Sequence, residues 1–132
     1  MKPLPPAYGW IDDLRSLPRM LEEARKLYGT FEVAGPADNP VILGWAKETG
    51  LAKSYNDDAI PWCGLFMAVV AKRAGKPVVE GPLWARNWAK FGKPADRAQL
   101  GDVLVFRRAQ GSGHVGLYVG EDYGAFHVLG GN

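Results

Sequence analysis

The sequence predicts an α+β fold, in which helices come first along the chain and a small antiparallel sheet follows. Up to Phe91 the apolar residues recur at helical spacing, and from Leu100 onward they alternate at the two-residue period of strands. The 17 glycines and 10 prolines supply many turns, which suits a small mixed fold better than a helical bundle. Helices followed by strands is the order typical of an α+β domain, with a helix covering one face of the sheet.

Two amphipathic helices are expected in the first third of the chain. Residues 17–28 carry apolar side chains on one helical face, with Pro18 suited to the first turn and Gly29 to the end. Pro40 opens a second short helix, and Gly50 closes it. A loop rich in serine, asparagine and aspartate follows.

The third predicted helix differs from the first two, because residues 62–71 contain no polar group except the thiol of Cys63. A helix that is apolar on every side is buried on every side. A fourth short helix is expected over residues 82–91, where Trp84, Trp88 and Phe91 recur at helical spacing and Gly92 follows.

Three strands are expected in the last third, over residues 103–106, 115–119 and 125–129. The connections 107–113 and 121–124 are short and contain glycine. Short connections of this kind join antiparallel neighbours. The strands should therefore pair in sequence order as a meander.

Length and charge exclude several classes of protein. A chain of 132 residues has room for a single domain, expected over 1–132. Its net charge of +2 is too small for a nucleic-acid-binding surface. No apolar run has the length of a signal peptide or a membrane span, so we expect synthesis in the cytoplasm and no membrane insertion. The single cysteine cannot form an internal disulfide.

The chemistry of the chain depends on Cys63 and His114. A cysteine at the start of a helix lies near unpaired backbone N–H groups that favour the thiolate. Alternatively, Cys63 is a small buried core residue. His114 follows a Gly-Ser-Gly loop at the start of a strand, and Gly116 would leave room for the buried helix. His114 could then act on the thiol as general base, or it could be an ordinary strand residue.

A cysteine–histidine pair needs a third group to orient the imidazole. Asn132, at the end of Leu-Gly-Gly-Asn, and His127 are the two candidates, besides several acids after His114. Each has an alternative role, Asn132 as a turn or terminal residue and His127 as a strand residue. Zinc bound by Cys63, His114 and His127 is disfavoured, since no spacing typical of a metal site is present, and we predict no metal.

Four motifs in this order resemble the CHAP and NlpC-type cysteine peptidases of bacterial cell walls, and in particular a phage-associated CHAP-like branch. The motifs are Pro61-Trp62-Cys63-Gly64-Leu65-Phe66, Leu100-Gly101-Asp102-Val103-Leu104-Val105-Phe106, Gly113-His114-Val115-Gly116-Leu117-Tyr118 and Val128-Leu129-Gly130-Gly131-Asn132. Trp10, Gly35-Pro36 and Asp38-Asn39-Pro40 are also spaced as in that branch. The resemblance covers nearly the whole chain.

This resemblance implies a papain-like fold with the cysteine helix packed on the sheet. It implies a peptidoglycan hydrolase that cleaves an amide bond, as an N-acetylmuramoyl-L-alanine amidase or a peptide endopeptidase, without a cofactor. Cys63 would be the nucleophile, His114 the base and then the acid, and Asn132 the orienting residue, while Trp62 is assigned to substrate binding. Such an enzyme would reach the wall through phage lysis, a tail particle or specialised secretion. Members of the branch usually continue past this motif with further strands, so we expect either that the chain lacks its last strands or that its sheet is unusually small.

Two other functions stay open on the same scaffold. One is a non-catalytic wall-binding or phage structural module. The other is a contact-dependent toxin with an inhibitor protein as its partner. The loops 30–39 and 51–60 would decide which bond is cut, and they contain no readable motif.

Overall fold

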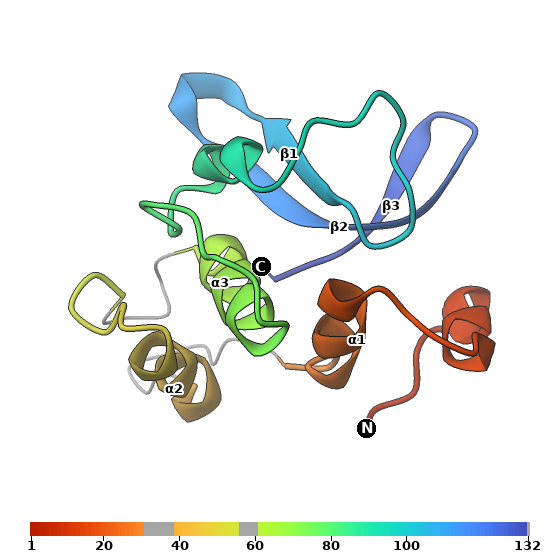
Figure 1. Ribbon diagram of the computed structural model, residues 1–132, viewed down its shortest axis with the longest axis horizontal. Coiled ribbons are helices and arrows are strands. Elements are labelled where there is room, and N and C mark those ends of the chain that lie inside the picture. Colours follow the sequence, from red (N-terminus) through yellow and green to blue (C-terminus); the bar gives the residue numbers. More distant parts are fainter. Residues whose placement is uncertain (31–38, 56–60, 132) are drawn as a thin grey trace.

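The fold combines helices with a three-stranded antiparallel sheet, as a computed structural model of the chain shows (Figure 1). The structure describes residues 1–30, 39–55 and 61–131. In Figure 1 the sheet lies above α3 and α1, and α2 lies below α3, on the side away from the sheet. The described residues therefore form the α+β arrangement that the sequence predicts.

The three α-helices begin and end close to the predicted positions. They are α1 (Arg19–Lys26), α2 (Pro40–Glu48) and α3 (Cys63–Arg73). Asn39 caps α2, because its side chain accepts a 2.8 Å hydrogen bond from the N–H of Val41. Every residue of α3 from Cys63 to Ala71 is buried, which confirms the prediction for a helix that is apolar on all sides.

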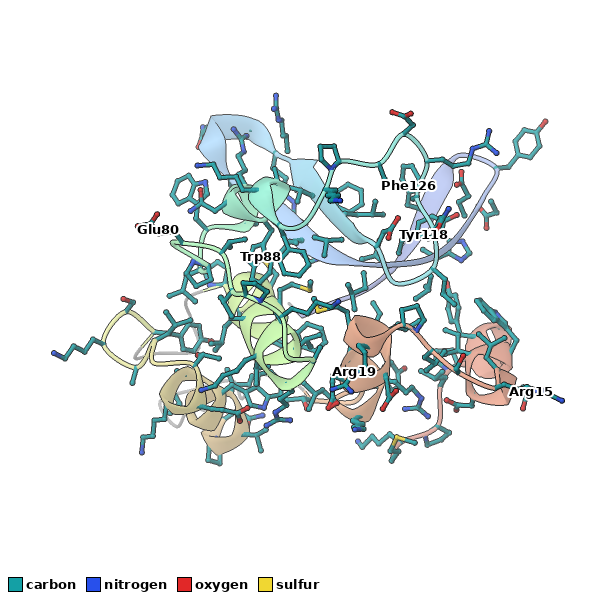
Figure 2. All side chains as sticks on the ribbon, in the orientation of Figure 1. Arg15, Arg19, Glu80, Trp88, Tyr118 and Phe126 are labelled. Carbon is teal, nitrogen blue, oxygen red and sulfur yellow. The ribbon has the colours of Figure 1, made fainter. Side chains whose placement is uncertain are left out.

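The fourth predicted helix is a 3-10 helix, η2 (Ala85–Lys90), and it is shorter than expected. Trp84 precedes it in extended conformation and is 56% exposed, whereas Trp88 is 1% exposed. The prediction of one helix that contains Trp84, Trp88 and Phe91 is therefore wrong, since Trp84 and Phe91 flank η2 in extended conformation. Figure 2 shows Trp88 between η2 and α3.

The strands are β1 (Val103–Arg107), β2 (Gly113–Asp122) and β3 (Ala125–Leu129), in the order β1-β2-β3. Both pairs are antiparallel, with Phe106 opposite His114 and Leu117 opposite Leu129. The predicted meander is therefore confirmed. Two further 3-10 helices, η1 (Pro6–Asp13) and η3 (Ala109–Gly111), were not expected from the sequence.

The core lies between α3 and one face of the sheet. Val115, Leu117 and Val119 alternate along β2 and are all buried in the same cluster as α3. The other face of β2 carries His114 and Tyr118, which are only partly buried. Tyr118 and Phe126 lie together on the sheet (Figure 2), with ring centroids 6.2 Å apart.

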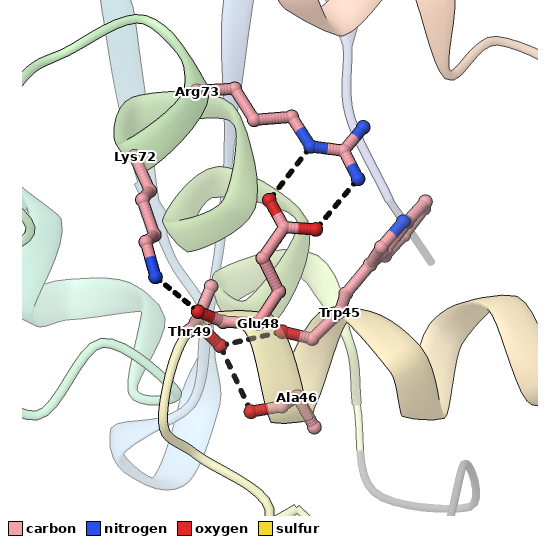
Figure 3. Close-up of polar contacts among 6 residues, drawn as sticks. All are labelled: Trp45, Ala46, Glu48, Thr49, Lys72 and Arg73. Atoms are coloured by element: carbon pink, nitrogen blue, oxygen red, sulfur yellow. Dashed lines mark hydrogen bonds and ion pairs between the residues drawn. The ribbon is translucent and has the colours of Figure 1, made fainter.

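Polar contacts attach the outer helices to this core. Arg73 of α3 donates two hydrogen bonds to the Glu48 carboxylate of α2, 2.8 and 2.7 Å long, and Lys72 donates to the Glu48 carbonyl (Figure 3). Arg25, which is 5% exposed, donates to both Asp12 carboxylate oxygens, at 2.8 and 2.9 Å. These bidentate pairs fix α2 against α3 and η1 against α1.

Within the described residues, no helix has both the length and the apolar character that crossing a bilayer would need.

Candidate active site

Cys63 is the first residue of α3, as the sequence predicts. The first helical hydrogen bond runs from the Phe66 N–H to the Trp62 carbonyl, at 2.9 Å. The amide groups of the first turn therefore have no acceptor within the helix and point toward its N-terminal end. The Cys63 side chain is 4% exposed and makes no hydrogen bond with the described residues.

Trp62 lies in the core beside this cysteine and is 6% exposed. Its ring centroid is 6.1 Å from that of Trp45 and 6.4 Å from that of Phe66. This aromatic cluster packs α2 against the start of α3. Trp62 thus supports the helix start as a core residue, and its contact with substrate stays a prediction.

Gly64 lets a neighbouring loop approach the start of α3. A Cβ atom at this position would lie well inside 3.0 Å of the Pro82 carbonyl oxygen and 3.0 Å from Leu83 Cα. The same Pro82 oxygen accepts a 2.9 Å hydrogen bond from Trp88 Nε1. The segment before η2 is therefore packed directly against the candidate nucleophile's helix.

His114 is the second residue of β2 and is partly buried. Its ring lies 6.3 Å from that of Phe106, centroid to centroid, with an angle of 31° between the ring planes. Burial lowers the pKa of His114 below its usual 6.5, and the positive charge of Arg108 lowers this pKa further. The structure therefore favours the neutral imidazole, the form that a general base requires.

The structure places His114 and the start of α3 on opposite faces of the sheet. Successive strand residues point to opposite faces, and Val115 points into the core against α3 while His114 shares the outer face with Phe106. No hydrogen bond joins the imidazole to the thiol. The two groups are therefore near the same end of the sheet without being in contact.

The role expected of Gly116 is not the one observed. The space beside it is filled by Val128 of β3, so this glycine accommodates a neighbouring strand and not the helix. The glycine that faces the helix is Gly131, where a Cβ atom would lie 2.6 Å from the Trp62 ring.

Two consecutive glycines separate His114 from the start of α3. A Cβ atom on Gly130 would lie 3.6 Å from His114 Nε2, and a Cβ atom on Gly131 would meet Trp62 and Phe66. The chain after β3 accordingly passes the start of α3 (Figure 1). The Gly130–Gly131 backbone thus lies between the His114 imidazole and the Trp62 and Phe66 side chains near Cys63.

His127, one of the two candidates for orienting His114, has other partners. Its Nδ1 is 2.9 Å from the Tyr8 hydroxyl, and its Nε2 is 2.9 Å from Asp122 Oδ2. Both ring nitrogens are therefore engaged, and the tyrosine connects η1 to β3. This network leaves no nitrogen of His127 for the His114 ring.

The other candidate, Asn132, lies outside the described residues, as do most of the loops expected to set bond specificity. Among the residues that the structure describes, no three histidine, cysteine, aspartate or glutamate side chains gather as a metal site would require.

Sequence reasoning missed two exposed residues at this end of the molecule, Trp84 and Arg108. The helical spacing of Trp84 and Trp88 predicted one helix through both residues, whereas η2 begins after Trp84. The Gly81-Pro82 pair is the sequence signal that marks a turn here, and Gly81 has a φ of 60° in the structure.

No family model matches the chain, and no curated protein or solved structure is detectably similar to it.

Proposed function

We propose that this protein is a cysteine-dependent peptidoglycan hydrolase that cleaves an amide bond, with a papain-like arrangement of helix and sheet. The observation that carries the proposal is Cys63 at the first position of a helix that is buried from Cys63 to Ala71 and whose first-turn amides have no helical acceptor. Such a position supplies backbone N–H groups for an oxyanion. The order of the four motifs, which resemble those of CHAP-like peptidases, supplies the substrate class.

In this mechanism the Cys63 sulfur attacks the amide carbonyl carbon, and the carbonyl oxygen becomes an oxyanion held by backbone N–H groups. His114 first takes the thiol proton and then gives it to the leaving amine. The resulting thioester is hydrolysed by water, which His114 activates as general base. No cofactor takes part.

The mechanism requires the imidazole to reach the thiol. His114 lies at the start of its strand, with Gly113 before it and Gly130 beside its ring. For the two groups to meet, the His114 side chain must leave the outer face of the sheet and the Gly130–Gly131 segment must move aside, a rearrangement that substrate binding would have to drive. The lowered pKa of His114 keeps the ring in the basic form needed for the first proton transfer.

The test compares Cys63→Ser and Cys63→Ala with the wild-type chain. We expect wild-type protein to clear a suspension of purified cell walls and both variants to lose that activity. Ala68→Ser is the matched control, because it also places a hydroxyl at a fully buried position of α3 without touching the thiol. Mass spectrometry of the soluble products would identify the amide that is cut.

Retention of wall clearing by Cys63→Ser would overturn the proposal, provided that both variants unfold as cooperatively as Ala68→Ser. A second candidate is a non-catalytic wall-binding module. It is favoured by one observation, that His114 and the start of α3 are on opposite faces of the sheet without a hydrogen bond. Sedimentation of wild-type protein with intact walls, without release of any soluble product, would establish that alternative.

A further inference from the structure

Trp84 belongs to a segment that contacts both the start of α3 and the loop that leads to His114. The segment just before it, Pro82 and Leu83, packs against Gly64 beside Cys63. On the other side, a Cβ atom on Gly111, in the loop that leads to His114, would lie 3.9 Å from Trp84 Cζ2. The indole is 56% exposed, although tryptophan is usually buried. A large apolar ring is therefore open to solvent on the segment that makes these two contacts.

Arg86 holds the loop beside this indole in one conformation. Its Nε donates to the Ser112 carbonyl at 3.0 Å, and its Nη2 donates to the Arg108 carbonyl at 2.7 Å. Within the loop, Gln110 has a φ of 61°, a left-handed conformation that is costly for a residue other than glycine. The loop is thus fixed by specific contacts that keep a strained backbone in place, which is common where a protein binds a ligand.

Arg108 brings an open positive charge to the same loop. It is exposed, and none of the described carboxylates pairs with its guanidinium. Arg25 and Arg73, by contrast, each hold a carboxylate through two hydrogen bonds. The charge of Arg108 acts on His114, because it lowers the pKa of that ring. The Arg108 guanidinium therefore has donors left for a ligand, on the loop that Arg86 holds beside Trp84.

We propose that Trp84 and Arg108 form a substrate subsite for an acidic glycopeptide, in which a sugar ring stacks on the indole and a peptide carboxylate binds the guanidinium. This inference rests on the proposed function, since it names how the wall substrate is held beside the catalytic groups. Charge complementarity selects this occupant: the stem peptides of peptidoglycan carry free carboxylates, and arginine binds carboxylates through paired hydrogen bonds. Aromatic rings supply a rigid apolar platform in ligand sites of this kind.

The test measures binding by the full chain carrying Cys63→Ala, so that no turnover is needed. The probes are N-acetylmuramyl-L-alanyl-D-glutamate and its D-isoglutamine counterpart, which differ by one carboxylate. We expect the acid to bind more tightly than the amide. Trp84→Ala should weaken both probes about 10-fold or more, whereas Arg108→Gln should weaken the acid by about 10-fold and remove the preference, as expected for one charge-assisted pair.

Two control variants match these changes away from the subsite. Trp10 is also an exposed tryptophan, at 43%, and Arg15 is an exposed arginine that Figure 2 shows near η1, at the far end of the molecule from η2. Trp10→Ala and Arg15→Gln should leave both dissociation constants unchanged.

Three results would overturn the subsite: no binding of either probe, equal effects of Trp84→Ala and Trp10→Ala, or an acid preference that persists in Arg108→Gln. These results are independent of the proposed activity. If Cys63→Ser still clears walls, the nucleophile assignment is lost while the binding data stand. If the subsite is lost, wall clearing by wild-type protein still decides the activity.

Discussion

Replacing Gly64 by alanine tests the contact on which the candidate active site is built. The new Cβ atom would lie well inside 3.0 Å of the Pro82 carbonyl oxygen and 3.0 Å from Leu83 Cα. Both neighbours are backbone atoms, which cannot rotate away as a side chain does. The segment before η2 must therefore move, and the Trp88 hydrogen bond to the same oxygen must lengthen or break.

The cost follows from two opposing effects. Overpacking a tight contact costs about 1–3 kcal/mol, and loss of the Trp88 hydrogen bond adds about 1 kcal/mol. Alanine recovers about 1 kcal/mol through its greater helix propensity. We expect Gly64→Ala to lower the free energy of unfolding by about 1–3 kcal/mol.

Gly44→Ala is the matched control, because Gly44 is in the interior of α2 and a Cβ atom there would meet nothing within 4 Å. This variant should be more stable than wild type by about 0.5–1 kcal/mol. Urea unfolding followed by circular dichroism measures both variants. If Gly64→Ala proved as stable as Gly44→Ala, Pro82 and Leu83 would not be packed on α3 at Gly64. The contact between this segment and the start of α3, on which the proposed site depends, would then be refuted.

Two further predictions concern charge. Arg108→Gln should raise the pKa of His114 toward 6.5, because the arginine charge is one of the two causes that lower this pKa. Proton NMR titration measures the change, and the variant His127→Gln assigns the signal of the only other histidine. An unchanged pKa of His114 would refute the effect of the Arg108 charge. Glu48→Gln should lower the free energy of unfolding by at most about 1 kcal/mol, since both partners of the Glu48–Arg73 pair are about a third exposed. Arg73 lowers the pKa of Glu48 below 4.5, so the stabilisation by this pair should be fully present above pH 4.5 and be lost as the pH falls through the lowered pKa. Urea unfolding of wild type and Glu48→Gln at a series of pH values measures this stabilisation. A stability difference that stays constant into strong acid would contradict the pairing.

The sequence by itself determined the elements of the fold. Helices α1, α2 and α3 follow from apolar spacing bounded by proline and glycine, and the strands follow from alternation between short glycine-containing connections. These features depend on neighbours along the chain, so local patterns suffice to predict them. Cys63 at the start of a buried helix could be predicted for the same reason.

Only the tertiary structure decided how the predicted site residues face one another. Alternation along β2 places Val115 in the core and His114 on the outer face, and which face α3 covers depends on contacts between distant segments. Likewise, the spacing of Trp84 and Trp88 is helical in the sequence, but Trp84 precedes η2 in extended conformation and is exposed. The physical reason is that local patterns set the period of an element, whereas long-range packing selects the face that is buried.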